Sequence, residues 1–427
     1  MTGVVKKSSV SLFFSVLLVA TYAVNYPLFL GLRPVDIVLI LFAAWGVLNN
    51  GIRSRALLIL IMTFGVLYFL STLYGVLRIG IIEPKNFAFI YKYSILFVCI
   101  WLVFSSEFHE QQVKFLLKFL FFSFLVIIAY EYLSLYRCKI EYPELVHTFR
   151  PNFPFTDPFP SAGGGYLGDA HLFAAYISTG LLAIIFSRQY GLLRIGLPFY
   201  SLLLIVVFAG MLLTGSRNGI VTFSATVLLC GFLRLTKRIA ARKNLLTIKD
   251  ASLQLVFVVL VGVAVLLVLY TKYGTQQNVA KRLLRRSVYF SLSEDQSYLG
   301  RVRKFTTAGD LVMDGPVIIG PGLQSTSRSF FDGAVPSILV AAGLGGVCVY
   351  VAIIVVSLVI LHKKATQNQR LKEFQILFFV SLNYFLANLI TEFFLVSRSV
   401  IPFAVFWALI AKLIYMPLCS PPVATET

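Results

Sequence analysis

Long apolar runs separated by short polar connections make up most of the chain. Apolar segments of spanning length fall at about 10–31, 35–49, 56–77, 86–105, 113–135, 169–187, 194–214, 218–235, 251–271, 334–361, 373–396 and 398–417. A bilayer core of about 30 Å needs roughly 20 apolar residues in a helix, and uniform runs without period-two alternation exclude a membrane β-barrel. The pattern predicts an all-α polytopic integral membrane protein, one transmembrane domain over residues 1–427. We expect about twelve transmembrane helices, with eleven or thirteen as the alternatives.

Two long polar stretches, 136–168 and 272–333, interrupt the apolar pattern. The first is rich in proline and contains three consecutive glycines, Gly163 to Gly165, which indicates an irregular loop. The second contains the basic run Lys281 to Arg286 and an amphipathic stretch from about Gly300 to Met313. Such segments can lie on a membrane surface.

Composition and charge set the orientation. The chain is 58% hydrophobic and 13% charged, with 37 Lys and Arg against 18 Asp and Glu. Cytoplasmic loops of membrane proteins collect Lys and Arg, and only one of the two topologies places most of the short-loop cations inside. In that topology both termini are cytoplasmic, and both long loops face the periplasm or the cell exterior. The surplus of cations in the second loop then needs a local reason, such as an anionic lipid-linked substrate.

Several classes of protein are not favoured. No nucleic-acid-binding motif accompanies the basic residues. The five cysteines are scattered, without CxxC or His/Cys spacing for a metal. We therefore expect no nucleic acid, no metal and no cofactor.

Ionisable residues recur near the predicted outer ends of the helices. They are Asp36, Lys92, Glu131, Asp169, His171, Arg217, Glu392 and Arg398. Charges are expensive inside a bilayer, so their shared depth favours one water-accessible cavity that opens outward. Interfacial ion pairing is the alternative interpretation for each residue.

The segment Leu213 to Gly219 lies where the seventh predicted span turns into the eighth. A helix N-terminus offers free N–H groups and a partial positive charge to an anion, and Arg217 adds a planar guanidinium suited to bidentate phosphate contact. A bare turn with an interfacial arginine is the alternative.

Two further segments belong to the second long loop. Arg301 and Arg303 precede the turn at Gly320 to Gly322 and would face the membrane surface, where a lipid pyrophosphate lies. Generic attraction to anionic headgroups is the alternative. Asp332 is the acid nearest the next apolar span and could act as a general base on a sugar hydroxyl. It could equally pair with a nearby arginine or cap a helix.

These motifs resemble the O-antigen polymerase and O-antigen ligase superfamily of bacterial envelope proteins. The resemblance rests on Thr214 to Gly219 opening a helix, on Gly300-Arg301 through Gly322 in a large outer loop, and on Asp332 before a glycine-containing helix. Gly163 through Leu172, which opens the sixth span, is also similar. The resemblance covers about residues 140–350.

The resemblance implies a metal-independent, GT-C-like glycosyltransferase in the bacterial inner membrane that uses undecaprenyl-pyrophosphate-linked oligosaccharides at the periplasmic face. It implies that Arg217 and Arg301, helped by Arg303, bind the pyrophosphate. Asp332 is the first candidate for the catalytic base, followed by His171 and Asp169. Besides its substrates and membrane lipids, such an enzyme would work with a chain-length regulator and a flippase.

A polymerase is favoured over a ligase because ligases usually place a His-Asn pair where this chain has Phe331-Asp332. An O-antigen ligase with a lipid A-core acceptor and a lipid-linked oligosaccharide flippase or transporter are the alternatives. A flippase should show internal repeats and midplane charges, and the sequence shows neither.

Overall fold

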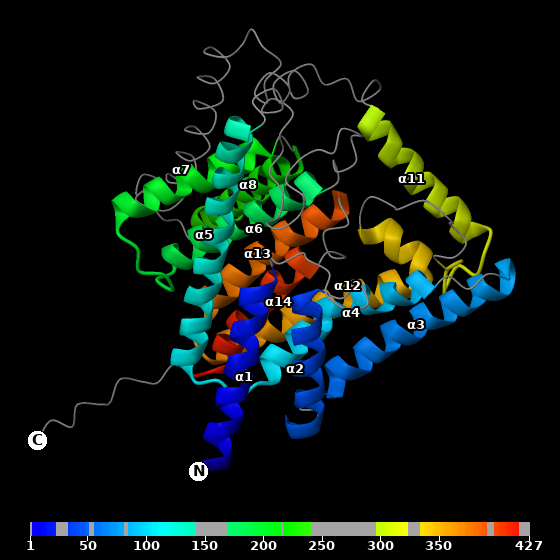
Figure 1. The fold of residues 1–427 in the computed structure, drawn as a ribbon, viewed down its shortest axis with the longest axis horizontal. Helices are drawn as coiled ribbons and strands as arrows, with labels where there is room; N and C mark the ends of the chain where they lie inside the picture. Colours follow the sequence, from blue (N-terminus) through cyan, green and yellow to red (C-terminus); the bar gives the residue numbers. More distant parts are fainter. Residues whose placement is uncertain are drawn as a thin grey trace, which may run out of the picture.

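The computed structural model describes residues 2–22, 33–50, 55–80, 84–141, 169–214, 217–240, 296–322, 334–390 and 397–417. These residues form helices joined by short connections, and they contain no strand (Figure 1). The helices are α1 (Thr2–Thr21), α2 (Pro34–Asn50), α3 (Arg55–Ile79), α4 (Pro84–Ser105), α5 (Glu110–Glu141), α6 (Asp169–Gln189), α7 (Leu197–Leu213), α8 (Arg217–Ala240), α11 (Gln296–Met313), α12 (Ala334–Gln367), α13 (Leu371–Ile390) and α14 (Ser397–Tyr415).

The helices agree with the apolar pattern. Each predicted span that falls on described residues overlaps a helix, whereas the span 251–271 lies outside the described residues. The amphipathic stretch predicted from Gly300 corresponds to α11. Helix α1 begins and ends earlier than predicted, and α5 continues to Glu141, into the stretch assigned to the first long loop.

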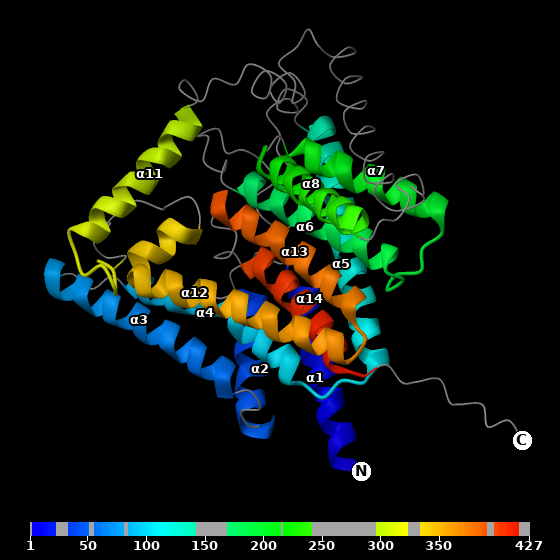
Figure 2. The same ribbon diagram turned by 180° about the vertical axis from the view of Figure 1, so that it is seen from behind.

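Helix α14 lies at the centre of the bundle. It packs most extensively against α4 and also contacts α13, α5, α12, α1 and α6. On one side, α3 and α11 pack against α12, and on the other α6, α7 and α8 form a second group, as both views show (Figures 1 and 2).

Much of the outer surface is apolar. By length and composition, two described helical segments could cross a membrane, Glu110–Ser134 and Ala334–Gln367, and seven shorter apolar segments accompany them in the described residues. Large apolar side chains point outward, including Leu48 (83% exposed), Leu77 (77%) and Leu228 (72%). Soluble monomers rarely expose broad apolar surfaces.

Helix α12 is broken at Gly343, whose backbone is left-handed at φ 66° and ψ −169°. The connection that follows α11 fills the break. Leu344 N–H donates to Val317 O at 2.9 Å, Gly345 N–H donates to Ile318 O at 2.9 Å, and Gly322 N–H donates to Val340 O at 3.0 Å. Three of the backbone groups next to the break therefore find hydrogen-bond partners in this connection.

Glycine is needed here because two backbones touch. A Cβ atom at position 343 would overlap the carbonyl oxygen of Ile318. One at position 320 would lie 2.5 Å from the backbone nitrogen of Gly343. The Ser71 hydroxyl of α3 also donates to Gly320 O at 3.2 Å, so α3 fixes the same junction.

We expect Gly343→Ala to destabilise the protein by at least about 1–3 kcal/mol, because an alanine there is strained at positive φ and also meets backbone. Gly309 is the matched control: it lies inside α11 with open space around its Cβ position. Gly309→Ala should be neutral or stabilise by about 0.5–1 kcal/mol. Thermal unfolding of the purified protein in detergent measures both, and equal effects would contradict this account of the junction.

Charged side chains join the helix ends at the opposite end of the bundle. Arg370, 5% exposed in the turn between α12 and α13, donates to Glu373 Oε1 at 3.0 Å, to Glu110 Oε2 at 3.2 Å and to Met416 O at 3.3 Å. Lys412 of α14 donates to Phe104 O at 3.0 Å and to Ser106 O. These cations bind the C-terminal carbonyls of α14 and α4, where the helix dipole is negative.

Candidate functional site

The first turn of α8 packs against the N-terminal half of α6. The two helices pack along their length, and a Cβ atom at position 219, in the first turn of α8, would lie only 2.6 Å from the carbonyl oxygen of Ala174. Glycine at 219 therefore permits backbone contact. Gly219 is the third residue of α8, so it belongs to the helix itself.

A buried polar cluster maintains this pairing further along the helices. Asn383 of α13, fully buried, donates to Ser178 Oγ at 3.0 Å and to Thr179 Oγ1 at 2.9 Å, both on α6. Thr226 of α8 lies 3.3 Å from Asn383 Oδ1, within hydrogen-bonding distance. One amide thus joins three helices. Interhelical hydrogen bonds in membranes average about 0.6 kcal/mol.

Three of the predicted site residues lie at the starts of two helices that pack against each other. Asp169 and His171 lie in the first turn of α6, and Arg217 is the first residue of α8. Their backbones are described, although their side chains lie outside the described part. The paired helix starts also present two positive dipole ends in the same direction.

Arg301 and Arg303 lie on another helix. Both are in α11, which packs against α12, whereas α8 packs against α6, α13 and α7. Arg303 is exposed, on the face of α11 opposite Val312, which is buried. The side chain of Arg301 and all of Asp332 lie outside the described residues, and Asp332 precedes α12 by two positions.

Glu131 of α5 is the most unusual ionisable residue of the described bundle. Its side chain is 1% exposed, and neither carboxyl oxygen has a hydrogen-bond partner among the described residues. The carboxyl points at Gly210 of α7, where a Cβ atom would lie 2.8 Å from Oε2. Gly210 precedes the end of α7 by one turn, so Glu131 lies near the connection that leads to Arg217.

Sequence reasoning placed Glu131 among the polar residues at helix ends but gave it no role in the site. Its burial against a glycine could not be inferred from the apolar pattern around it. The neighbouring Tyr132 packs against the same helix, and its hydroxyl donates to Val206 O at 2.6 Å.

Asp36 helps to cap the start of α2. Its carboxylate accepts a hydrogen bond of 3.0 Å from the backbone N–H of Arg33, immediately before α2. This is the reciprocal half of a helix-capping box, with Pro34 at the first helical position. The side chains of Lys92, Glu392 and Arg398 lie outside the described residues.

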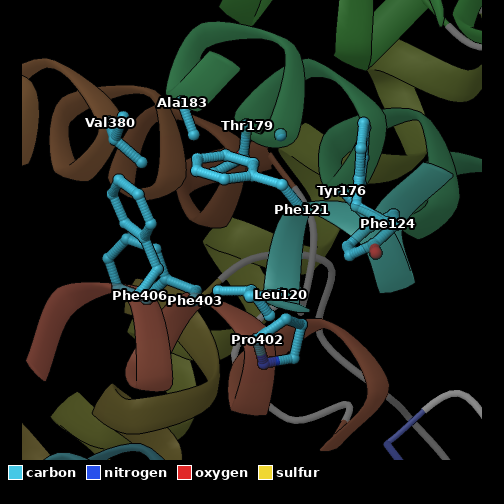
Figure 3. Close-up of a pocket in the computed structure, with 11 residues that line it drawn as sticks. Leu120, Phe121, Phe124, Tyr176, Thr179, Ala183, Val380, Pro402, Phe403 and Phe406 are labelled. Atoms are coloured by element: carbon cyan, nitrogen blue, oxygen red, sulfur yellow. The ribbon is translucent and has the colours of Figure 1, made fainter. Parts of the chain in front are cut away.

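One cavity beneath the paired helices is too small for a substrate. Aromatic rings of α5 and α14 surround it together with Tyr176 and Thr179 of α6 and Pro402 of α14 (Figure 3). Its volume is about 50 Å³, whereas ligand pockets usually measure about 300–1,000 Å³. Its lining is almost wholly apolar, so we interpret it as a packing defect beside Pro402.

Metal and disulfide chemistry have no support in the described residues. No group of three or more His, Cys, Asp or Glu side chains that could hold a metal occurs there. Cys99, Cys230 and Cys348 are not in disulfides.

Comparison with models of known protein families gives no match for this chain, and comparison with curated proteins gives none either.

We expect Glu131→Leu to raise the stability of the folded protein by about 1–3 kcal/mol, because it removes a buried polar group that has no hydrogen-bond partner among the described residues. Glu131→Gln is the control: it keeps the shape and leaves an amide with the same deficit, so it should give no such gain. Thermal unfolding in detergent compares the two. If Glu131→Leu destabilises the protein and Glu131→Gln does not, the Glu131 carboxyl has a hydrogen-bond partner in the folded protein, which would contradict this prediction.

Proposed function

We propose that this protein is a membrane-embedded glycosyltransferase of the O-antigen polymerase type. It joins undecaprenyl-pyrophosphate-linked oligosaccharide repeat units at the periplasmic face of the bacterial inner membrane. The observation that supports the proposal is the packing of the first turn of α8, which begins at Arg217, against the N-terminal half of α6, whose first turn contains Asp169 and His171.

The apolar surface supports membrane embedding. Exposed leucines, valines and phenylalanines cover the outsides of α2, α3, α8 and α12, and in water such a surface would drive aggregation. The broken helix α12 fits the same environment, because the connection after α11 satisfies its free backbone groups. We propose a polytopic arrangement with both termini in the cytoplasm, as the distribution of Lys and Arg predicts.

The paired helix starts support recognition of a phosphate. Two helix N-termini at one place favour an anion through their dipoles and free N–H groups. Arg217 adds a permanent charge with two parallel N–H donors. A pyrophosphate leaving group develops negative charge as its bond to the sugar breaks, so cations placed there stabilise the transition state.

The proposed reaction is a displacement at the anomeric carbon of the growing glycan. A hydroxyl at the non-reducing end of the new repeat unit forms the C–O bond and loses its proton to a base, while the bond from C1 to the lipid pyrophosphate breaks. Undecaprenyl pyrophosphate leaves with the electron pair. Asp332 remains our first candidate for the base, with His171 and Asp169 next, and Arg301 and Arg303 would assist Arg217 from the second long loop.

Replacing Arg217 with alanine should abolish long polymer in cells while single repeat units still reach the surface. One charge-assisted hydrogen bond contributes about 1.5–3 kcal/mol, so loss of a bidentate pair should reduce polymerisation by two orders of magnitude or more. Arg217→Lys keeps the charge and should restore only part of it. Gel separation of surface polysaccharide measures chain length. Arg194→Ala, an exposed cation at the other end of α7, is the control.

The same gel separates the alternatives. A flippase variant would lose single units as well as polymer, and a ligase variant would accumulate polymer that stays on its lipid carrier. Wild-type chain length in the Arg217→Ala strain would remove the site assignment.

Gly219→Ala tests whether the contact between the helix starts matters. The added methyl group meets the Ala174 carbonyl and should push α8 away from α6, which would shorten the polymer while Arg217 remains present. Gly231→Ala, further along α8 with open space at its Cβ position, should leave the polymer unchanged. Equal effects of the two substitutions would show that helix propensity, and not the contact, decides the outcome.

A further inference from the structure

We infer that the end of the bundle opposite the paired helix starts binds an anionic phospholipid of the cytoplasmic leaflet. The headgroup would enter a polar chamber beside Lys412, and one acyl chain would lie in the apolar groove between α4, α12 and α14. This inference rests on the membrane embedding proposed above, and it is independent of glycosyl transfer.

The polar chamber is a cavity of about 450 Å³ at the ends of α4 and α14 and the start of α5, within the usual size range of ligand sites. Its lining includes Ser8, Ser105, Glu107, His109 and Lys412. The chamber is therefore large enough for a phospholipid headgroup and is lined by hydrogen-bonding side chains.

One hydroxyl in this chamber is buried without a partner. Ser105 is only 9% exposed, and its Oγ has no hydrogen-bond partner among the described residues. The ammonium of Lys412 is held beside it by the carbonyls of Phe104 and Ser106, and it lies 5.4 Å from the ring centre of Phe108. A fixed cation next to an unsatisfied hydroxyl suits a phosphate oxygen.

The apolar groove continues directly from the chamber. It has a volume of about 170 Å³, and Phe104 and Tyr415 line both the groove and the chamber. Beyond them its walls are aliphatic and aromatic side chains of α4, α12, α13 and α14, with Ser357 as the single serine. A polar chamber joined to an apolar groove is complementary to an amphiphile, which has a polar headgroup and a hydrocarbon chain.

The length of the groove matches one leaflet. From Phe104 to Leu96 it follows α4 for about 12 Å, and from Tyr415 to Phe403 it follows α14 for about 18 Å. Half of a bilayer core is about 15 Å. A chain that enters at the chamber therefore ends near the midplane, so the ligand belongs to the leaflet on the chamber side.

The charge at the mouth selects an anionic headgroup. Lys412 lines the chamber, and the Lys364 ammonium lies 5.9 Å from the ring centre of Tyr415, at the junction of chamber and groove. Glu107 is the one acidic residue in the described lining. Two cations against one carboxylate favour phosphatidylglycerol over a zwitterionic lipid.

Trp407 lines the groove and provides the probe. A protein with Trp45→Phe and Trp101→Phe retains only this indole, because the chain has three tryptophans. In nanodiscs, phosphatidylglycerol with brominated chains should quench Trp407 at a lower mole fraction than brominated phosphatidylcholine, by about fivefold for one lysine contact. Quenching by both lipids at the same mole fraction would mean annular lipid only and would overturn the proposal.

Two variants distinguish binding of the lipid headgroup from binding of the acyl chain. Lys412→Gln should remove the preference for phosphatidylglycerol, whereas Lys372→Gln, an exposed lysine at the start of α13 at the same end, should keep it. Ser357→Phe fills the groove without touching the chamber and should weaken quenching by both lipids, which covers the case in which Lys412→Gln fails to fold. Unchanged quenching in Ser357→Phe would also overturn the proposal. Because the measurement contains no sugar, its outcome does not depend on whether the protein is a polymerase.

Discussion

Backbone groups inside an apolar bundle need hydrogen-bond partners from the protein itself, and this constraint explains the least regular part of the structure. Where α12 breaks at Gly343, the connection after α11 supplies carbonyls to the new helix start and an N–H to the old helix end. Leu344 and Gly345 then have no N–H left for a ligand. The break is a packing junction between α3, α12 and the connection, and the glycines of this segment are needed for close backbone contact.

The same constraint distinguishes the two ends of the bundle. At one end, Arg370 and Lys412 donate to carbonyls at the ends of α14 and α4, so these cations stabilise the helix ends. At the other end, α6 and α8 start together and their dipoles add up at one place. These two helix starts therefore carry a positive electrostatic potential.

Helix positions could be predicted because uniform apolar runs determine them, and the overlap of α2, α4 and α6 with the predicted spans confirms this. The ends of the helices were harder to predict, because α1 and α5 extend through polar residues that the apolar pattern does not distinguish from loops. Asp169, His171 and Arg217 were predicted to lie at one depth, and they occupy the first turns of two helices that pack against each other. The contact through Gly219 could not be predicted, because it depends on which helices are neighbours. The same holds for the separation of α11 from α8.

The buried polar residues show how structure and function divide within the bundle. Asn383 is fully buried, yet its amide finds Ser178, Thr179 and Thr226, so it stabilises the pairing of α6, α8 and α13. Glu131 is buried to the same degree and finds no partner among the described residues. A polar group that only held helices together would have its partners within the protein, because leaving it unsatisfied costs stability. Glu131 therefore lacks, among the described residues, the kind of partners that Asn383 has, and it lies one helical turn from the connection that leads to Arg217.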